Sequence, residues 1–353
     1  MKNLGGSMQL FNLSIINETT TEGLTPCQEF NPSVRVFFIV AYSLVFLVGL
    51  LLNGFILKFL FCQRQKSSRS IMVYLKNLAA ADFMLSLSLP FYIMHSAINS
   101  VNILRLYCKF GYGIFYLNMY TSILFMTYTA YNRYLKIVCS NKTHILQTVR
   151  GACIISIFTW VFMLTVGVTY VSVAFTTKRN LTSISNHCPD LHSTQFSVFT
   201  KVRSAFMSTI FMAFLMFIVF IYNRTSHKVS VVQQSQVTSS NCKKLAKSRR
   251  NMRVLVSVFC ICFTPFHLVN VFQNFLECSW SPVFNFMHEL TRVLSAVNIC
   301  LDPFIYFIFC KDFQEQLRLK NVFFLRRDTP DLNMERRPQN EAEPSIQSNS
   351  DSS

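Results

Sequence analysis

Long apolar runs constrain the fold of this chain more than any other feature. A helix needs about 20 mostly apolar residues to cross the hydrocarbon core of a bilayer, and seven runs reach that length. Only 14% of the residues are charged, whereas soluble domains carry about 25%. No run alternates with period two, which argues against an outer-membrane barrel. We therefore predict an all-α membrane protein, a bundle of seven transmembrane helices at residues 36–62, 71–98, 109–138, 152–175, 202–222, 254–275 and 286–309.

Basic residues follow the first, third, fifth and seventh runs, and the densest group is the stretch "NCKKLAKSRRNMR". Loops rich in Lys and Arg stay on the cytoplasmic side of a membrane. The amino terminus is therefore predicted to be extracellular and the carboxyl terminus cytoplasmic. The net charge of +17 is attributed to this asymmetry and to attraction for anionic membrane lipid. Because the basic residues flank membrane spans, nucleic acid is not predicted as a partner.

Four segments follow from this topology. Residues 1–34 form an extracellular segment with glycosylation acceptors at Asn12 and Asn17, and a third acceptor, Asn180, lies in the loop before the fifth span. Residues 35–309 form the transmembrane bundle. Residues 310–327 combine apolar and basic side chains, which is typical of a short amphipathic helix on the membrane surface. Residues 328–353 are predicted to be a disordered cytoplasmic tail, with serines suited to phosphorylation.

Four of the twelve cysteines fall on the predicted oxidising side: Cys27, Cys108, Cys188 and Cys278. Four cysteines allow three pairings. A bond between Cys108 and Cys188 would hold the loop before the fifth span across the mouth of the bundle. It would leave Cys27 to join the amino-terminal segment to the loop that holds Cys278.

Several motifs occur in a fixed order along the chain. They are "GLLLNG" with Asn53, "LKNLAAADFMLSLSLP" with Asp82 and Pro90, "NRY" at 132–134, Trp160, "CFTPFH" with Pro265, and "NICLDPFIYF" with Asp302, Pro303 and Tyr306. Over about residues 30–318 the chain resembles rhodopsin-class G-protein-coupled receptors. Within that class "IFYLNMYTSI" and "FIYFIFCKDF" resemble the purinergic branch, which includes the ADP and UDP-glucose receptors and lipid-sensing or orphan relatives.

The resemblance implies a plasma-membrane receptor and not an enzyme. Such receptors catalyse nucleotide exchange on a heterotrimeric G protein, and this branch acts mainly on the inhibitory type. The sequence departs from the branch at Phe214, where the branch has asparagine. It also has Asn270 and His288 where the branch has basic residues expected to hold a ligand's phosphates.

Arg292 is the predicted replacement for those basic residues. It lies four residues after His288 and three after Glu289, so the three share a helix face. An ionisable residue at this depth is costly and should face the bundle interior. We expect a small anionic extracellular ligand, a nucleotide or a lysophospholipid, at a site made of Tyr116, Lys201, Arg203, His267, Asn270, His288 and Arg292. Structural alternatives are a salt bridge between Arg292 and Glu289, headgroup contacts for Lys201 and Arg203, and a buried, satisfied His267.

A polar cluster is predicted at mid-membrane depth. Buried carboxylates normally pair or bind a cation, and the class resemblance implies a sodium ion held by Asp82, Ser122, Asn298 and Asp302. The alternative is a water-filled network without an ion. No other cofactor or metal is expected.

The inner half of the bundle contains the predicted machinery for G-protein coupling. Pro265 should kink the sixth span, with Phe263 one helical step below, and so provide a hinge. Its swing would open a cleft lined by Arg133, Tyr222 and Tyr306. Asn132 stands where most of the class has an acid, and it is predicted to accept a hydrogen bond from Arg133 as a weakened latch. The alternative is that Asn132 reflects neutral drift and that other residues of the third and sixth spans supply the latch. The set of residues for coupling and activation is Asn132, Arg133, Tyr134, Tyr222, Phe263, Pro265, Asp302, Pro303 and Tyr306.

Other functions fit less well. A retinal pump needs a lysine in the last span, and residues 286–309 contain none. A metalloenzyme needs clustered ligands, and the seven histidines form no such motif. A transporter usually shows internal repeats, which are not visible. A peptide receptor and a ligand-independent orphan receptor remain the closer alternatives.

Overall fold

The computed structural model describes residues 31–62, 69–98, 100–139, 144–176, 194–235, 240–275, 282–309 and Gln314. The chain divides into two compact units, Met1–Phe309 and Cys310–Ser353, and nearly all described residues belong to the first. Within these residues the regular structure is helical. The helices are α1 (Pro32–Cys62), α2 (Ser70–Ala97), α3 (Val101–Leu106), α4 (Tyr112–Val138), α5 (Val149–Thr176), α6 (Thr194–Ser235), α7 (Ser240–Phe275), α8 (Pro282–Ala296) and α9 (Asn298–Phe309).

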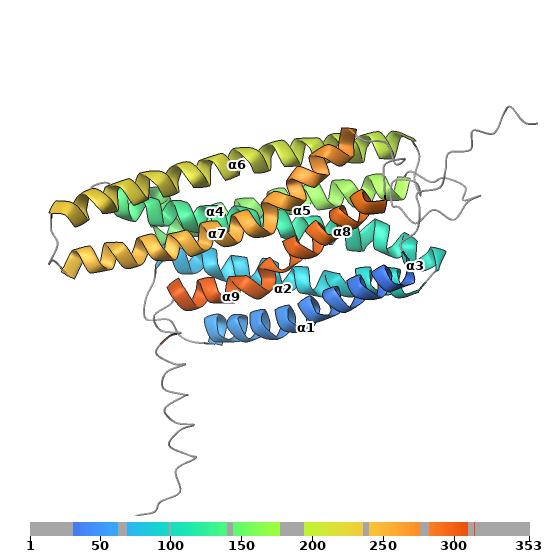
Figure 1. The fold of residues 1–353 in the computed structure, drawn as a ribbon, viewed down its shortest axis with the longest axis horizontal. Coiled ribbons are helices and arrows are strands. Elements are labelled where there is room, and N and C mark those ends of the chain that lie inside the picture. The colour runs from blue at the N-terminus through green and yellow to red at the C-terminus, as the bar shows by residue number, and fades with distance from the viewer. Residues whose placement is uncertain are drawn as a thin grey trace, which may run out of the picture. The chain divides into compact units, whose positions relative to one another are not determined.

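The long helices run side by side as one bundle (Figure 1). A π-helical turn, Tyr107–Gly111, joins α3 to α4 without a break. α8 and α9 follow one another through a turn at Val297. When each of these pairs is taken as one span, the bundle has the seven spans predicted from the sequence, so the predicted fold class is confirmed.

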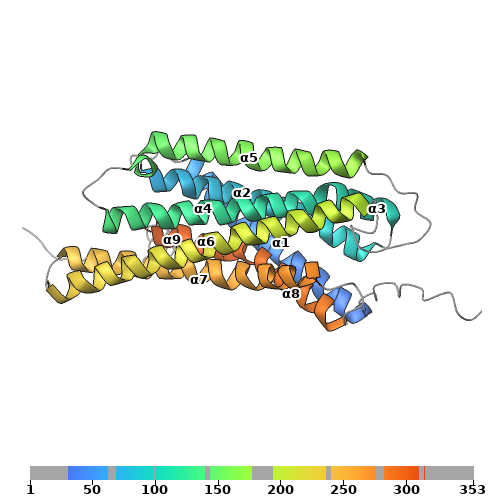
Figure 2. The same cartoon turned by 90° about the horizontal axis from the view of Figure 1, so that it is seen from above.

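Six spans of the described chain are long and apolar enough to cross a membrane on length and composition alone, and they involve α1, α2, α5, α6, α7 and the α8–α9 pair. The remaining span, α4, packs against α2, α5, α6 and α7, and Figure 2 shows it between α5 and the α6–α7 pair. It carries polar side chains that are buried in the bundle, among them Asn118, Thr121 and Ser122. Its central position explains why it is less apolar than the outer helices.

The outward faces of the bundle are apolar. Leu51 of α1, Phe158 of α5 and Met216 of α6 are each 70% or 71% exposed. In a soluble protein such side chains would be mostly buried. Here they face the hydrocarbon of the membrane.

Two helices extend beyond the predicted limits. The apolar runs at 202–222 and 254–275 become α6, which reaches Ser235, and α7, which begins at Ser240. Hydropathy marks only the part of a helix that lies in the membrane, so it does not detect the polar continuations of α6 and α7. Arg249 Nη1 donates to Ser230 Oγ at 3.1 Å and links the two extensions.

The expected amphipathic helix at 310–327 lies outside the described residues except for Gln314. The same holds for the tail at 328–353 and nearly all of the extracellular segment at 1–34. Below, the outer end of the bundle is the end with the amino terminus of α1, and the inner end is the opposite one.

Candidate functional site

A charged cluster lies at the outer end of α8. Arg292 Nη1 donates to Glu289 Oε2 at 2.7 Å, and its Nη2 lies 3.3 Å from His288 Nδ1. Tyr42 of α1 donates its hydroxyl to Glu289 Oε1 at 3.3 Å. His288 and Glu289 are buried. The predicted helix face is thus formed, and the salt bridge between Arg292 and Glu289, which was the structural alternative to a ligand role, is present.

Arg292 keeps hydrogen-bonding capacity beyond this pair. A guanidinium has five N–H donors and no acceptor. Its Nε is buried and has no hydrogen-bond partner among the described residues. Arg292 is also close enough to Tyr116 of α4 to interact with it electrostatically. The arginine therefore faces the bundle interior.

A second arginine faces inward from α6. The guanidinium carbon of Arg203 lies 5.5 to 5.7 Å from the ring centroids of Tyr116, Tyr170 and Tyr112. These distances are within the range of a cation–π interaction. Lys201, two residues earlier, is exposed. The headgroup alternative therefore suits Lys201 and does not describe Arg203, which is covered by rings.

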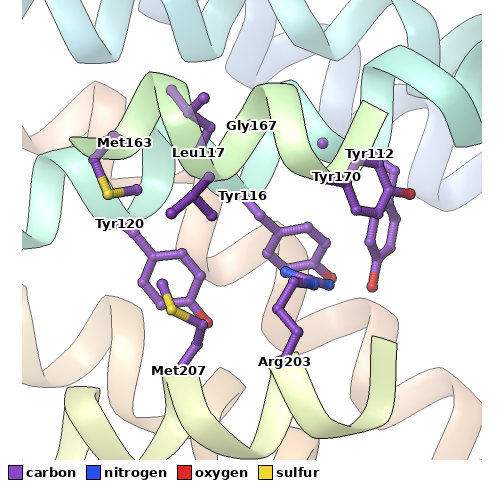
Figure 3. A pocket seen from close by; sticks show the side chains of 11 residues that line it. Tyr112, Tyr116, Leu117, Tyr120, Met163, Gly167, Tyr170, Arg203 and Met207 are labelled. Carbon is purple, nitrogen blue, oxygen red and sulfur yellow. The ribbon is translucent and has the colours of Figure 1, made fainter. Parts of the chain in front are cut away.

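A cavity of about 30 Å³ lies beside Arg203 (Figure 3). Three helices enclose it, because Tyr116 belongs to α4, Tyr170 to α5 and Arg203 to α6. About 10–15 Å³ of such volume holds one water molecule. The space suits a water cluster or a small ion, and a nucleotide would require the helices to separate.

The predicted ligand residues on α7 have other partners. Asn270 Nδ2 donates to Ser204 Oγ at 2.7 Å and to Ser208 Oγ at 3.2 Å. His267 stacks on Phe211 with ring centroids 3.9 Å apart. Both residues therefore connect α7 to α6. His267 is buried without being satisfied, because neither ring nitrogen has a hydrogen-bond partner in the described chain.

The predicted sodium-site residues meet in the core. Ser122 Oγ donates to Asp82 Oδ1 at 2.9 Å, and Asp82 and Asp302 are close enough to interact electrostatically. Both carboxylates and Asn298 are fully buried. Asp82 Oδ2, both Asp302 oxygens and the Asn298 amide atoms have no hydrogen-bond partner in the described residues. Three buried carboxylate oxygens without donors fit a cation.

The predicted bond between Asn132 and Arg133 does not form. Asn132 Nδ2 donates to Ser70 Oγ at 2.9 Å and to the Leu146 carbonyl at 2.8 Å. Its Oδ1 is buried and has no hydrogen-bond partner among the described residues. The guanidinium carbon of Arg133 lies 4.6 Å from the Phe309 ring centroid. Consecutive residues point to different sides of a helix. The hydrogen bond between Arg133 and Asn132, on which the weakened-latch interpretation depends, is therefore wrong.

The other residues predicted for coupling and activation differ in how deeply they lie. Tyr134 and Tyr222 are partly exposed. Asn251 of α7 donates to the Ile308 carbonyl of α9 at 3.3 Å, which links these two helices at the inner end. The remaining members are buried side chains or prolines inside α7 and α9: Phe263, Asp302, Tyr306, Pro265 and Pro303.

Among the cysteines, Cys108 is buried and disulfide-bonded. Its predicted partner Cys188 lies outside the described residues, as do Cys27 and Cys278, so the pairings stay predictions. The acceptors Asn12, Asn17 and Asn180 also lie outside. Within the described residues no three His, Cys, Asp or Glu side chains are grouped to hold a metal ion.

The aromatic neighbours of Arg203 and Arg133 were largely not predicted from the sequence. They are Tyr112, Tyr120 and Tyr170 near Arg203, and Phe309 near Arg133. One signal was available, because Tyr112, Tyr116 and Tyr120 follow each other at intervals of four residues and so share a helix face. Tyr170 and Phe309 come from distant helices, and no local spacing connects them to the arginines.

Comparison with known proteins agrees with this arrangement. Residues 52–306 match the family model "7 transmembrane receptor (rhodopsin family)". The chain is 32% identical to purinoceptor 14 of Bos taurus over 286 residues, 78% of this chain and 82% of that protein. It is 31% identical to purinoceptor 13 of Homo sapiens over 330 residues, 86% of this chain and 90% of that protein.

A third similar protein is G-protein coupled receptor 87 of Mus musculus, which is 30% identical over 299 residues, 82% of this chain and 81% of that protein. This family consists of membrane receptors, and G proteins are their partners. The apolar outer faces of the bundle agree with a multi-pass protein of the plasma membrane. The chain belongs to the rhodopsin family of seven-transmembrane receptors, in its purinergic-like branch of G-protein-coupled receptors.

Proposed function

We propose that this receptor senses a small anionic extracellular ligand, a nucleotide or a lysophospholipid, and signals through the inhibitory class of heterotrimeric G proteins. The observation that carries the proposal is Arg292, which is directed into the outer half of the bundle with a buried, unpartnered Nε in the described structure. A charge inside a membrane bundle normally marks a ligand or ion path. An anion at Arg292 would complete its donors.

Glu289 restricts which anions can bind there. Its carboxylate already neutralises Arg292, so an incoming phosphate or carboxylate would approach two opposite charges. Nε has no partner among the described residues, and Nη2 already contacts His288 Nδ1. Such an arrangement suits a ligand with one compact anionic group better than an extended polyphosphate chain.

Asn270 supports the same conclusion. The branch resemblance implies a basic residue at this position, and the amide here is directed to two serines of α6. An amide carries no charge for a phosphate. Recognition of the anion would therefore move from α7 to α8.

We also propose that a sodium ion is held by Asp82, Ser122, Asn298 and Asp302. Buried oxygens of the two carboxylates and of Asn298 lack donors in the described residues, which suits a small hard cation. The ion would supply positive charge between the two carboxylates, and Ser122 would orient Asp82 through its hydrogen bond.

The signalling geometry is part of the proposal. With the amino terminus outside, the ligand end of the bundle faces the medium and Arg133 faces the cytosol. In the structure, the Phe309 ring lies against the guanidinium of Arg133. Movement of the inner end of α7 about Pro265 would expose the arginine to a G-protein helix. Arrestin is proposed as a second partner of the same inner face.

Coupling is tested by nucleotide exchange. The receptor, reconstituted in lipid nanodiscs, is mixed with purified G proteins of the inhibitory, stimulatory and phospholipase-coupled classes, and binding of a non-hydrolysable GTP analogue is followed. We expect catalysed exchange on the inhibitory class above both others. Equal exchange on the stimulatory class would contradict the proposed coupling. Arg133→Ala, which removes the proposed docking side chain, is the control.

A further inference from the structure

Arg203 keeps an uncompensated positive charge between α4, α5 and α6. The faces of three tyrosine rings surround its guanidinium at 5.5 to 5.7 Å. An aromatic face attracts a cation but carries no net charge, so the charge of the arginine remains. Arg203 forms neither an ion pair nor a hydrogen bond with the part of the chain that the structure describes.

Arg292 shows what such a charge normally requires. It lies in the same bundle and pairs with Glu289 at 2.7 Å. A buried charge without a partner is strongly destabilising, and ionisable residues within membranes pair or face a cavity. Arg203 faces a cavity and contacts no acid among the described side chains. No described side chain therefore supplies a counter-charge to Arg203.

The cavity beside Arg203 can hold that counter-charge. Its volume of about 30 Å³ exceeds what one water needs and is too small for a phosphate with its four oxygens. Figure 3 shows the guanidinium beside the ring of Tyr116, with Leu117 and Met163 on the side of α4 and α5. We propose that this cavity binds a compact monovalent anion of the size of chloride, with Arg203 as its positive partner.

The lining of the cavity favours a weakly hydrated anion of single charge. Leu117, Met163 and Val166 are apolar, and transferring a dianion from water to such surroundings costs far more than transferring a monoanion. Tyr170 donates its hydroxyl to the Cys108 carbonyl at 2.8 Å, so this hydroxyl is not available to donate to the anion. Arg203 supplies the positive charge, and chloride is preferred over sulfate.

The proposed anion joins three helices. Side chains of α4, α5 and α6 meet at the cavity, so the site exists only in the folded bundle. A ligand that binds only the folded state raises thermal stability in proportion to the logarithm of its concentration. The anion site can be tested without an agonist and without a G protein.

The experiment uses the full-length receptor in lipid nanodiscs and follows thermal unfolding. Sodium is held constant, because a proposed sodium site lies in the same bundle, and chloride replaces gluconate up to about 150 mM, a physiological ionic strength. We expect the melting temperature to rise with the logarithm of the chloride concentration and to gain about 3–6 °C once chloride exceeds its Kd tenfold. Arg203→Gln should lose this rise, and Lys201→Gln, which changes an exposed cation two residues away, should keep it.

Sulfate and bromide distinguish a specific site from a general salt effect. Bromide should replace chloride, and sulfate at equal ionic strength should give no rise. Equal rises with sulfate, or an Arg203→Gln receptor that still responds to chloride, would overturn the proposal. If Arg203→Gln does not fold, Arg203→Lys retains the charge and should respond with weaker affinity. Anomalous diffraction from a bromide-soaked crystal should show a peak within hydrogen-bond reach of Arg203, and a cavity without such a peak would also overturn it.

Discussion

Replacing Asn132 with aspartate distinguishes a structural role of this residue, in hydrogen bonds that link helices, from a role as a latch on Arg133. In the structure its amide nitrogen donates to Ser70 Oγ at 2.9 Å and to the Leu146 carbonyl at 2.8 Å. Aspartate puts an acceptor oxygen at that position. The Ser70 hydroxyl can turn and donate to it, whereas the Leu146 carbonyl cannot. Asn132→Asp should therefore weaken the link between α4, α2 and the Leu146 segment.

The size of the effect follows from these contacts. Losing one donor to a fully buried carbonyl costs about 1–3 kcal/mol, and the Leu146 carbonyl is partly buried. Tyr74 also donates to the Leu146 carbonyl, at 3.2 Å, so the carbonyl keeps a partner and the loss should be about 1–2 kcal/mol. The opposing gain, an ion pair with Arg133 at a partly exposed site, is at most about 1 kcal/mol. It also requires the side chain to leave its buried position. The loss of stability therefore exceeds the gain.

Thermal unfolding in nanodiscs and agonist-free signalling at matched surface expression measure the two roles separately. We expect the melting temperature of Asn132→Asp to fall by about 2–8 °C while agonist-free signalling does not decrease. Ser70→Ala, which leaves the Leu146 bond in place, is the control and should be milder. A variant as stable as the wild type with reduced agonist-free signalling would refute this reasoning and support the interpretation of Asn132 as a latch.

Three other changes test separate parts of the structure. Asn270→Ala removes two hydrogen bonds between α7 and α6 and should lower stability by about 1–2 kcal/mol, and an unchanged thermal melt would show that the contacts contribute nothing. Arg133→Ala should reduce agonist-stimulated nucleotide exchange to background while agonist binding persists, and retained exchange would exclude it from the docking surface. Peptide mapping without reductant should recover Cys108 joined to Cys188, whereas recovery of Cys108 with another cysteine would disprove that pairing.

The fold was largely predictable because the bilayer sets a length scale that the sequence must obey. Every apolar run became part of a helix. The predicted helix ends were wrong where α6 and α7 continue into polar sequence. Hydropathy reports the surrounding medium, while the end of a helix depends on backbone hydrogen bonds. The break between α8 and α9 at Val297 has no apolar signature either.

The site was predictable only where its residues are neighbours along a helix. His288, Glu289 and Arg292 share a face because of their spacing, and the structural alternative for Arg292, its salt bridge with Glu289, follows from the same spacing. The partners of Asn132 and Arg133 come from other helices and from the segment before α5. Sequence spacing carries no information about such contacts, since packing of distant segments determines them.

A panel of ligands applied to cells tests whether Arg292 binds an anionic agonist. Nucleotides, nucleotide sugars, lysophospholipids, neutral lipids and peptides are applied to the wild type and to Arg292→Ala at equal surface expression. Suppression of cyclic AMP is measured with and without pertussis toxin. We expect an anionic compound to suppress cyclic AMP, the toxin to abolish the response, and Arg292→Ala to weaken potency well over tenfold, since loss of a buried charged contact costs about 2–5 kcal/mol. Unchanged potency in Arg292→Ala, or activation by a neutral lipid or uncharged peptide alone, would contradict the proposed function.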